Sequence, residues 1–225
     1  MCGRYTFTKT PKPEEVLQPE QGSLPLAPRY NIAPSQLCLI KAIGEPQRYQ
    51  FFRWGLVPFW ARDPKIGYKM INARSETVLE KPAFREGIRH RRCLIPADGF
   101  YEWKKTGKSK QPYRITLNQG QPFHFAGLTE SWKTPAGDQL ETFTILTIEP
   151  NDLMKDIHDR MPVILNPEEE LGWLDSQQDA ETLVRSLRPY PADQMNAYAV
   201  SAAVGNVRND SPSLIEPTGF TGTLF

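Results

Sequence analysis

Apolar positions in this chain occur mostly in short runs, each bounded by Pro, Gly, Asn or Asp. Runs of this length that are rich in β-branched and aromatic residues are typical of strands separated by turns. The pattern therefore predicts strands at residues 37–40, 50–54, 92–95, 112–117, 123–128, 143–148 and 197–201.

Three segments carry helix signals instead. Asn166 is a suitable N-cap for a helix with Pro167 in its first position, and three glutamates and then spaced apolar residues follow. A second helix is expected over residues 176–187, and a short one over residues 151–158. Because strands dominate and helices gather late, we expect an α+β fold that is mostly β. Its core would be a curved, partly closed, barrel-like sheet with a few peripheral helices.

No internal repeat or low-complexity linker divides the chain, so residues 1–225 are expected to form a single domain. A chain of this length can bury about 70% of its unfolded surface. The three cysteines have no disulfide or zinc spacing, so neither a metal nor a cofactor is expected. No signal peptide or transmembrane-length apolar run is present, which favours a soluble cytoplasmic protein without a membrane partner.

The charges nearly cancel, with 27 Lys and Arg against 26 Asp and Glu and a net charge of +1. Such a balance argues against a protein that coats nucleic acid non-specifically, although it permits a local basic groove. Basic residues cluster over residues 85–92 and 104–110, and residues 54–60 could offer aromatic platforms for bases. Charge runs are usually solvated faces and aromatic residues usually belong to the core, so these signals decide nothing alone.

Cys2 is the first candidate for chemistry. Removal of the initiator methionine would leave Cys2 with a free α-amine, whose pKa near 7.7–8.0 makes its neutral fraction about 200–400 times that of a lysine. An amine condenses with an aldehyde to a Schiff base, and the adjacent thiol can then close a five-membered thiazolidine. The alternative is a frayed terminus, but the β-alternation of residues 3–7 favours a docked strand.

Three further motifs could assist. His158 lies at the end of a predicted helix and could transfer protons, although a surface histidine is also possible. Glu102 lies between Tyr101 and Trp103 on a predicted strand, and burial would raise its pKa and make it a general acid. The alternation leaves open whether Glu102 faces inward. Asn72 and Arg74 would share one side of an extended segment, where an amide could orient a nucleophile and a guanidinium could bind phosphate.

Together these segments resemble the SRAP (SOS-response-associated peptidase) family of abasic-site-processing proteins. No single motif is specific, but seven occur in the family's order over nearly the whole chain. They are residues 1–4 (MCGR), 30–34 (YNIAP), 54–58 (WGLVP), 72–77 (NARSET), 97–103 (ADGFYEW), 157–162 (IHDRMP) and 204–209 (VGNVRN).

The resemblance implies a covalent DNA–protein cross-link to abasic sites in single-stranded DNA, formed by a monomer that is nucleoid-associated when bound. It implies that Cys2 is the nucleophile, that Asn72 holds its reacting groups, and that Glu102 and His158 transfer protons. The DNA contacts that it implies are Arg4, Phe59, Trp60, Arg74, Thr147 and Arg160.

Two other functions remain open from the residues. In an autoprocessing cysteine peptidase or N-terminal-nucleophile hydrolase, Cys2 would attack an amide with Glu102 or His158 as base. Only Met1 precedes Cys2, so no propeptide needs autolysis, which disfavours this alternative. In a non-covalent single-stranded DNA-binding module, the small net charge would be a poor fit. Lyase-like chemistry at the abasic site is a further possibility for an enzyme of this kind.

Overall fold

The computed structural model describes residues 2–18, 26–107 and 109–218. Met1 and Lys108, which the sequence interpretation used, lie outside the described residues. The strands are β1 (Tyr5–Phe7), β2 (Arg29–Ile32), β3 (Leu37–Ala42), β4 (Glu45–Trp54), β5 (Asn72–Arg74), β6 (Arg92–Ala97), β7 (Gly99–Thr106), β8 (Ser109–Leu117), β9 (Phe123–Lys133), β10 (Gln139–Ile148), β11 (Met161–Pro162), β12 (Ile164–Leu165) and β13 (Met195–Ala199). The α-helices are α1 (Arg85–His90), α2 (Asp152–Lys155), α3 (Pro167–Leu174) and α4 (Ala180–Ser186).

Five strands form a closed barrel. β10 pairs with β4, β4 with β3, β3 with β6 and β6 with β9, and β9 returns to pair with β10 over seven residue positions. The predicted α+β, mostly β fold is therefore confirmed, and the barrel is closed rather than partly closed. Closure removes the free edges that an open sheet would expose.

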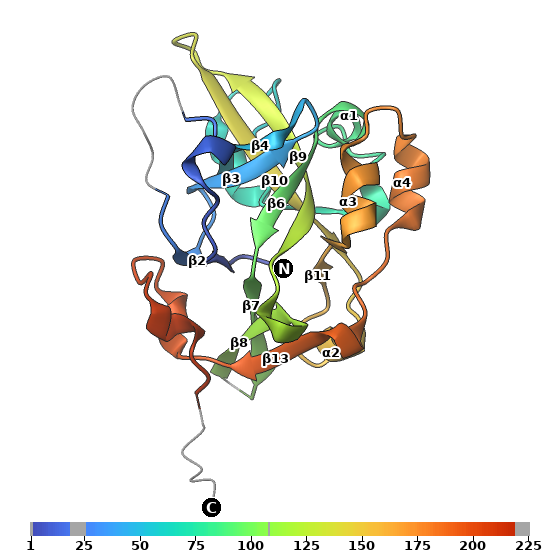
Figure 1. Cartoon of the computed structure of the whole chain (residues 1–225). Helices are drawn as coiled ribbons and strands as arrows, with labels where there is room; N and C mark the ends of the chain where they lie inside the picture. Colours follow the sequence, from blue (N-terminus) through green and yellow to red (C-terminus); the bar gives the residue numbers. More distant parts are fainter. Residues whose placement is uncertain (1, 19–25, 108, 219–225) are drawn as a thin grey trace, which may run out of the picture.

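A second sheet holds the start of the chain and lies below the barrel strands in Figure 1. Its strand order is β13-β8-β7-β1-β2, so β1 has neighbours on both sides. The residues that follow Cys2 are thus docked as a strand, as their alternation predicts. This placement brings the N-terminal segment between β7 and β2 and gives Cys2 a defined position.

All seven predicted strands are present, most of them longer than predicted, while two helices are shorter than expected. α4 begins at Ala180 rather than at residue 176, because the Asp179 side chain accepts from the N–H of Thr182 and caps the helix there. α2 ends at Lys155, so residues 156–160 leave the helix and carry His158 in a loop. The last predicted strand is shifted by two residues, to Met195–Ala199.

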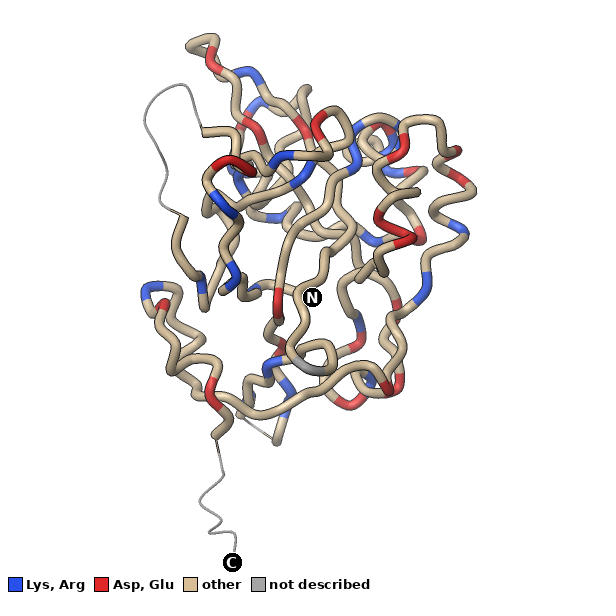
Figure 2. The backbone as a smooth tube through the Cα atoms, viewed as in Figure 1, with Lys and Arg blue, Asp and Glu red and all other residues tan. Residues whose placement is uncertain are grey.

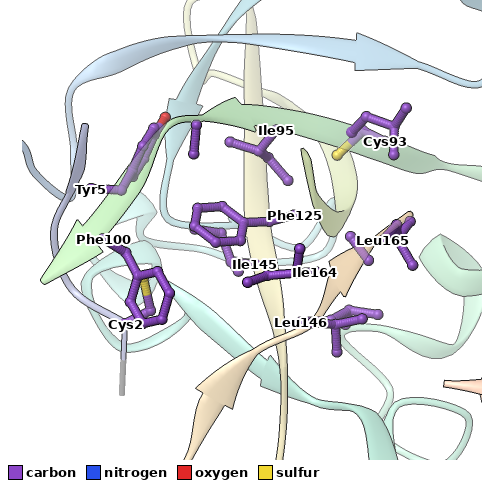
Figure 3. Packing of buried hydrophobic residues seen from close by; sticks show 14 of the residues in the cluster. Cys2, Tyr5, Cys93, Ile95, Phe100, Phe125, Ile145, Leu146, Ile164 and Leu165 are labelled. Atoms are coloured by element: carbon purple, nitrogen blue, oxygen red, sulfur yellow. The ribbon is translucent and has the colours of Figure 1, made fainter. Parts of the chain in front are cut away.

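A cluster of buried apolar side chains fills the barrel and extends under β1. Trp54 stacks against Phe143, and Tyr5 makes edge contacts with both Trp54 and Phe125. Figure 3 shows Cys2, Tyr5 and Phe100 at one end of the labelled side chains and Cys93 and Leu165 at the other. The N-terminal strand therefore packs on the barrel core. The single-domain organisation stays a prediction.

One predicted basic surface residue belongs to the interior. Arg92 is completely buried, and its guanidinium donates to the carbonyls of Ile88 and Arg89 at the end of α1 and of Trp173 and Asp175 at the end of α3. The last carbonyls of a helix have no partners within the helix, and a buried cation satisfies them here. Arg92 thus joins two helix ends to the barrel and cannot contribute to a DNA-binding face.

Replacing Arg92 with methionine is expected to destabilise the fold by about 2–4 kcal/mol, because carbonyls at two helix ends lose their buried donor. Urea unfolding followed by circular dichroism would measure the change. Arg89→Met, which removes an exposed cation from the neighbouring helix α1, is the control and should change stability little. Equal unfolding midpoints for the two variants would contradict this role of Arg92.

Candidate active site

The position of Cys2 follows from how β1 is held. Asp98 accepts hydrogen bonds from the hydroxyl of Thr6 (2.5 Å) and from the N–H of Thr8 (2.5 Å), and Arg114 pairs with the same carboxylate at 3.2 Å. β1 pairs antiparallel with β7, with Tyr5 opposite Phe100 and Thr6 opposite Gly99. Continuing this register places Gly3 opposite Glu102. The reactive terminus and the candidate acid therefore come from neighbouring strands.

Cys2 is completely buried and is held by polar contacts at both its carbonyl and its thiol. The side-chain amide of Asn72 donates to the Cys2 carbonyl at 2.9 Å, and the Cys2 thiol approaches the Arg4 carbonyl at 3.8 Å. Burial raises the pKa of the Cys2 thiol, and the nearby Glu102 carboxylate raises it further. Among the described residues, the buried Oδ1 of Asn72 has no hydrogen-bond partner, so it can accept from a donor on a reacting group.

Glu102 faces inward, which resolves what the alternation left open. Its side chain is 2% exposed although it lies next to Tyr101, which is also buried. Burial raises the pKa of Glu102, and His158 opposes part of the increase. The Oε2 atom of Glu102 lies 4.0 Å from Nε2 of His158. A carboxyl group in this environment can hold a proton at a higher pH than an exposed glutamate can.

Two neighbours compete for the other nitrogen of His158. The backbone N–H of Arg160 donates to Nδ1 at 3.1 Å, which requires a lone pair on Nδ1. The exposed Asp159 carboxylate lies 2.8 Å from the same atom, which favours a proton there. When Nδ1 accepts from Arg160, the proton of the neutral ring resides on Nε2, the nitrogen that faces Glu102.

Four of the predicted DNA contacts differ in burial and in what they bind. Arg74 is exposed at the end of β5, while Arg4 is partly buried and donates to the carbonyls of Gly3 and Gly205. Arg160 forms a two-bond ion pair with Glu76. Thr147 is 0% exposed, so direct contact with DNA is not available to it in this structure. Thr147 instead binds the guanidinium of Arg160 through its carbonyl at 2.6 Å.

Phe59 and Trp60 project from the surface, with 63% and 49% of their areas exposed. The loop that carries them is fastened to the barrel, because the indole N–H of Trp132 donates to the Ala61 carbonyl at 2.7 Å. Gly55 has a φ of 121°, and a side chain there would meet the Gly67 carbonyl at 2.7 Å. Exposed aromatic side chains on a loop with fixed ends can stack on unpaired bases.

Sequence reasoning missed the residues that close the C-terminal segment over β2. The amide of Asn31 donates to the carbonyls of Val204, Asn206 and Asn209, and the Asp210 carboxylate accepts from the N–H groups of Tyr30 and Asn31. These contacts hold Gly205 where it accepts from Arg4. Asn31 and its carbonyl partners belong to the YNIAP and VGNVRN motifs, which the sequence analysis identified. The sequence did not show that these two motifs are in contact.

Positive charge is not gathered into one stripe. In Figure 2 the Lys and Arg positions alternate with Asp and Glu positions along much of the described chain. Arg91, in the first basic run, pairs with Glu130 at 2.9 Å, and Arg92 is internal. The first basic run is therefore not a continuous basic face.

Within residues 2–18, 26–107 and 109–218, no three His, Cys, Asp or Glu side chains are grouped so as to hold a metal ion. In that same part of the chain, none of the helices has the length and apolar character needed to cross a membrane.

The chain is similar to several characterised relatives over almost its whole length. Abasic site processing protein YoqW of Bacillus subtilis is 52% identical over 96% of this chain and 99% of the relative. Abasic site processing protein YedK of Escherichia coli is 35% identical over 96% of this chain and 100% of the relative. A crystal structure of a protein from Bacteroides thetaiotaomicron superposes with a TM-score of 0.78, at 32% identity and 84% coverage of each chain. The family described as SOS response associated peptidase (SRAP) matches residues 1–207, so this chain belongs to that family.

Proposed function

We propose that this protein processes abasic sites in DNA by capturing them covalently through Cys2. The observation that carries the proposal is the meeting of four groups around one point. Asn72 binds the Cys2 carbonyl, Glu102 lies on β7 close enough to Cys2 to raise the pKa of its thiol, and His158 faces Glu102. The names of the relatives YoqW and YedK support abasic-site processing as the function.

The chemistry follows from what an abasic site offers. Its deoxyribose is mostly ring-closed, and ring opening exposes an aldehyde once a proton reaches the ring oxygen. The α-amine of Cys2 then attacks the aldehyde carbon, and loss of one water gives a Schiff base. Addition of the thiol to the imine carbon forms the C–S bond, and the thiol proton passes to nitrogen to complete a thiazolidine. Glu102 is the proposed proton donor in ring opening, with His158 binding the sugar and assisting.

The raised pKa of the Cys2 thiol favours attack by the amine, followed by addition of the thiol, over peptidase chemistry. A cysteine peptidase needs a thiolate, which low-pKa cysteines supply in electropositive surroundings. Cys2 has the opposite environment, since burial and Glu102 raise the pKa of its thiol. A protonated thiol is compatible with a mechanism in which the amine attacks first. The peptidase alternative therefore has less support than amine-initiated capture.

DNA contacts in this proposal come from the surface around Cys2. Arg4 and Arg74 would bind the phosphates that flank the abasic site, and Phe59 and Trp60 would stack on or exclude neighbouring bases. Arg160 is bound by Glu76 and by the Thr147 carbonyl, so these residues would support the DNA-binding surface from beneath. Separation of paired bases costs a few kcal/mol, so single-stranded DNA is the proposed substrate. The monomeric state and the nucleoid location stay predictions.

Denaturing gel electrophoresis tests the proposal directly. The mature protein is incubated with single-stranded DNA that carries one abasic site, then heated and denatured. We expect a slower-migrating adduct on this DNA, less on a fully paired abasic duplex, and none on an intact strand. The absence of any adduct would refute covalent capture. Equal yields on single-stranded and duplex substrates would refute the preference for single strands.

Residues added ahead of Cys2 are expected to abolish the adduct almost as completely as loss of the thiol. An acylated amine cannot form an imine, although the thiol remains. The measurement compares the mature protein with one that keeps an N-terminal tag, with both termini verified by mass spectrometry. Cleavage of the tag to expose Cys2 should restore the reaction. A tagged protein that reacts at the normal rate would mean that sulfur acts alone.

A further inference from the structure

Arg160, at the end of the loop that carries His158, forms an ion pair with Glu76. Arg160 donates to both carboxylate oxygens of Glu76, at 2.6 and 2.8 Å, and to the Thr147 carbonyl at 2.6 Å. Hydrogen bonding to Arg160 lowers the pKa of Glu76, so the carboxylate is charged near neutral pH. Paired bonds between a guanidinium and a carboxylate fix direction as well as distance. The side chain of Arg160 is thereby held in one orientation against the end of β10.

Glu76 belongs to the same segment as Asn72. It lies in the short 3₁₀ turn η3 (Ser75–Thr77), which begins immediately after β5. Between α2 and β11 the N–H groups of Ile157 and His158 donate to the Met154 carbonyl, whereas Arg160 is fixed through its side chain. The Glu76–Arg160 pair therefore connects the segment that binds Cys2 to the loop that carries His158.

The backbone of Arg160 also decides where the proton of His158 resides. Its N–H donates to Nδ1, while Asp159 lies close enough to the same nitrogen to favour a proton there. The first contact directs the proton to Nε2 and toward Glu102, and the second draws it to Nδ1 and away from Glu102. Only in the first arrangement can a neutral ring donate a hydrogen bond from Nε2, either to a sugar oxygen or to the carboxylate that Glu102 becomes once it has released its proton.

We propose that Glu76 is a positioning residue that, through Arg160, holds His158 as the Nε2–H tautomer facing Glu102. This inference rests on the proposed function, because His158 matters only if proton transfer accompanies capture of the sugar. Glu76 does not touch the reacting atoms and acts through the loop. Its effect is therefore on the rate of adduct formation and not on the affinity for DNA.

The alternative role of Arg160, binding a DNA phosphate, predicts the opposite effects on rate and affinity. If Arg160 serves only to bind phosphate, Glu76 competes with DNA for the same guanidinium. Removing the carboxylate would then strengthen binding and leave the rate at saturating DNA unchanged. Arg74, which faces Glu76, would add to that effect, because it too would lose a nearby negative charge. Rate and affinity therefore separate the two roles.

Nitrogen-15 NMR of the histidine rings tests the tautomer without any DNA. The chain has three histidines, so a His158→Gln spectrum identifies the signals of His158. At a pH where the ring is neutral, we expect the proton on Nε2 in the unmodified protein and a substantial Nδ1–H population in Glu76→Gln. Asp159→Asn added to Glu76→Gln should return the proton to Nε2, because it removes the competing carboxylate. An unchanged tautomer in Glu76→Gln would overturn the proposal.

Kinetics supplies the second test. Glu76→Gln is expected to lower the adduct rate at saturating abasic DNA by about 10- to 100-fold, as small misplacements of a proton-transfer group do. Binding to a tetrahydrofuran abasic analogue, which has no aldehyde to react, should stay the same. Glu80→Gln removes an exposed carboxylate nearby and is the control for net charge. Tighter binding with an unchanged rate would overturn the positioning role.

The two proposals fail in different ways. If the unmodified protein forms no adduct, covalent capture is wrong, whatever the tautomer of His158. If it forms the adduct but Glu76→Gln matches it in rate, only the positioning role is wrong. Recovery of the rate in the Glu76→Gln, Asp159→Asn double variant would exclude misfolding as the cause of the loss.

Discussion

Cys2→Ala is expected to abolish the heat-stable adduct with abasic single-stranded DNA while leaving the fold intact. Only a 1,2-aminothiol can close the thiazolidine ring, and no other residue of the chain can supply both groups at that spacing. Alanine keeps the α-amine, so a small amount of Schiff base could still form, and borohydride reduction would trap it. Denaturing gels with and without borohydride distinguish the two products.

The control for this variant is its own structure. Replacing a buried thiol with a methyl group leaves a small cavity and should cost on the order of 1 kcal/mol, too little to undo the β1–β7 pairing. Circular dichroism and thermal unfolding should therefore match the unmodified protein closely. An undiminished heat-stable adduct from a folded Cys2→Ala protein would rule out the thiazolidine.

Glu102→Gln is expected to slow adduct formation by about 10²–10⁴, the usual loss when a general acid or base is removed. The amide keeps the size of the side chain but cannot release a proton to the sugar ring oxygen. Burial raises the pKa of Glu102, so its acid form persists to a higher pH than in an exposed glutamate. The rate of adduct formation should fall as the pH rises through the pKa of Glu102. This pH dependence should vanish in Glu102→Gln.

A second buried glutamate provides the comparison. Glu130 is also buried with a raised pKa, but it pairs with Arg91 rather than facing Cys2. Glu130→Gln should leave the pH dependence of the rate unchanged, even if it lowers stability. Unaltered kinetics of Glu102→Gln over a pH series would mean that this carboxylate is structural.

Much of the fold could be predicted because its strands are marked locally. The run from Phe123 to Leu128 contains two aromatic residues and follows the turn residues Gly120 and Pro122, and β9 begins where predicted. Barrel closure was harder to foresee, since it depends on β9 pairing with both β6 and β10. Such pairings join distant segments and have no local signature.

In the candidate site, too, the features with a local sequence signature were predictable and those set by long-range contacts were not. Cys2 and its strand were predictable from the unusual chemistry of an N-terminal cysteine and the alternation after it. The direction of Glu102 was not, because Tyr101 and Glu102 are both buried on adjacent positions of β7, which a half-exposed strand does not allow. Arg92 and Arg160 resembled surface cations in the sequence, and only the fold reveals that carbonyls or a carboxylate engage them.

The interior position of β1 in its sheet has a consequence for biosynthesis. β1 cannot complete its sheet until β7 has been made, and at about 5–20 residues per second the ribosome needs on the order of 5–20 s to reach the end of that strand. During this interval β2 is the only one of the two partner strands of β1 that has been made, and the N-terminus is accessible to an aminopeptidase. Once β7 pairs with β1, Cys2 is buried, so its backbone is less accessible than in the nascent chain and trimming is expected to be slower. Nascent chains that fold before trimming would therefore be stable but unreactive, so the active fraction of a preparation should depend on how quickly methionine is removed during translation.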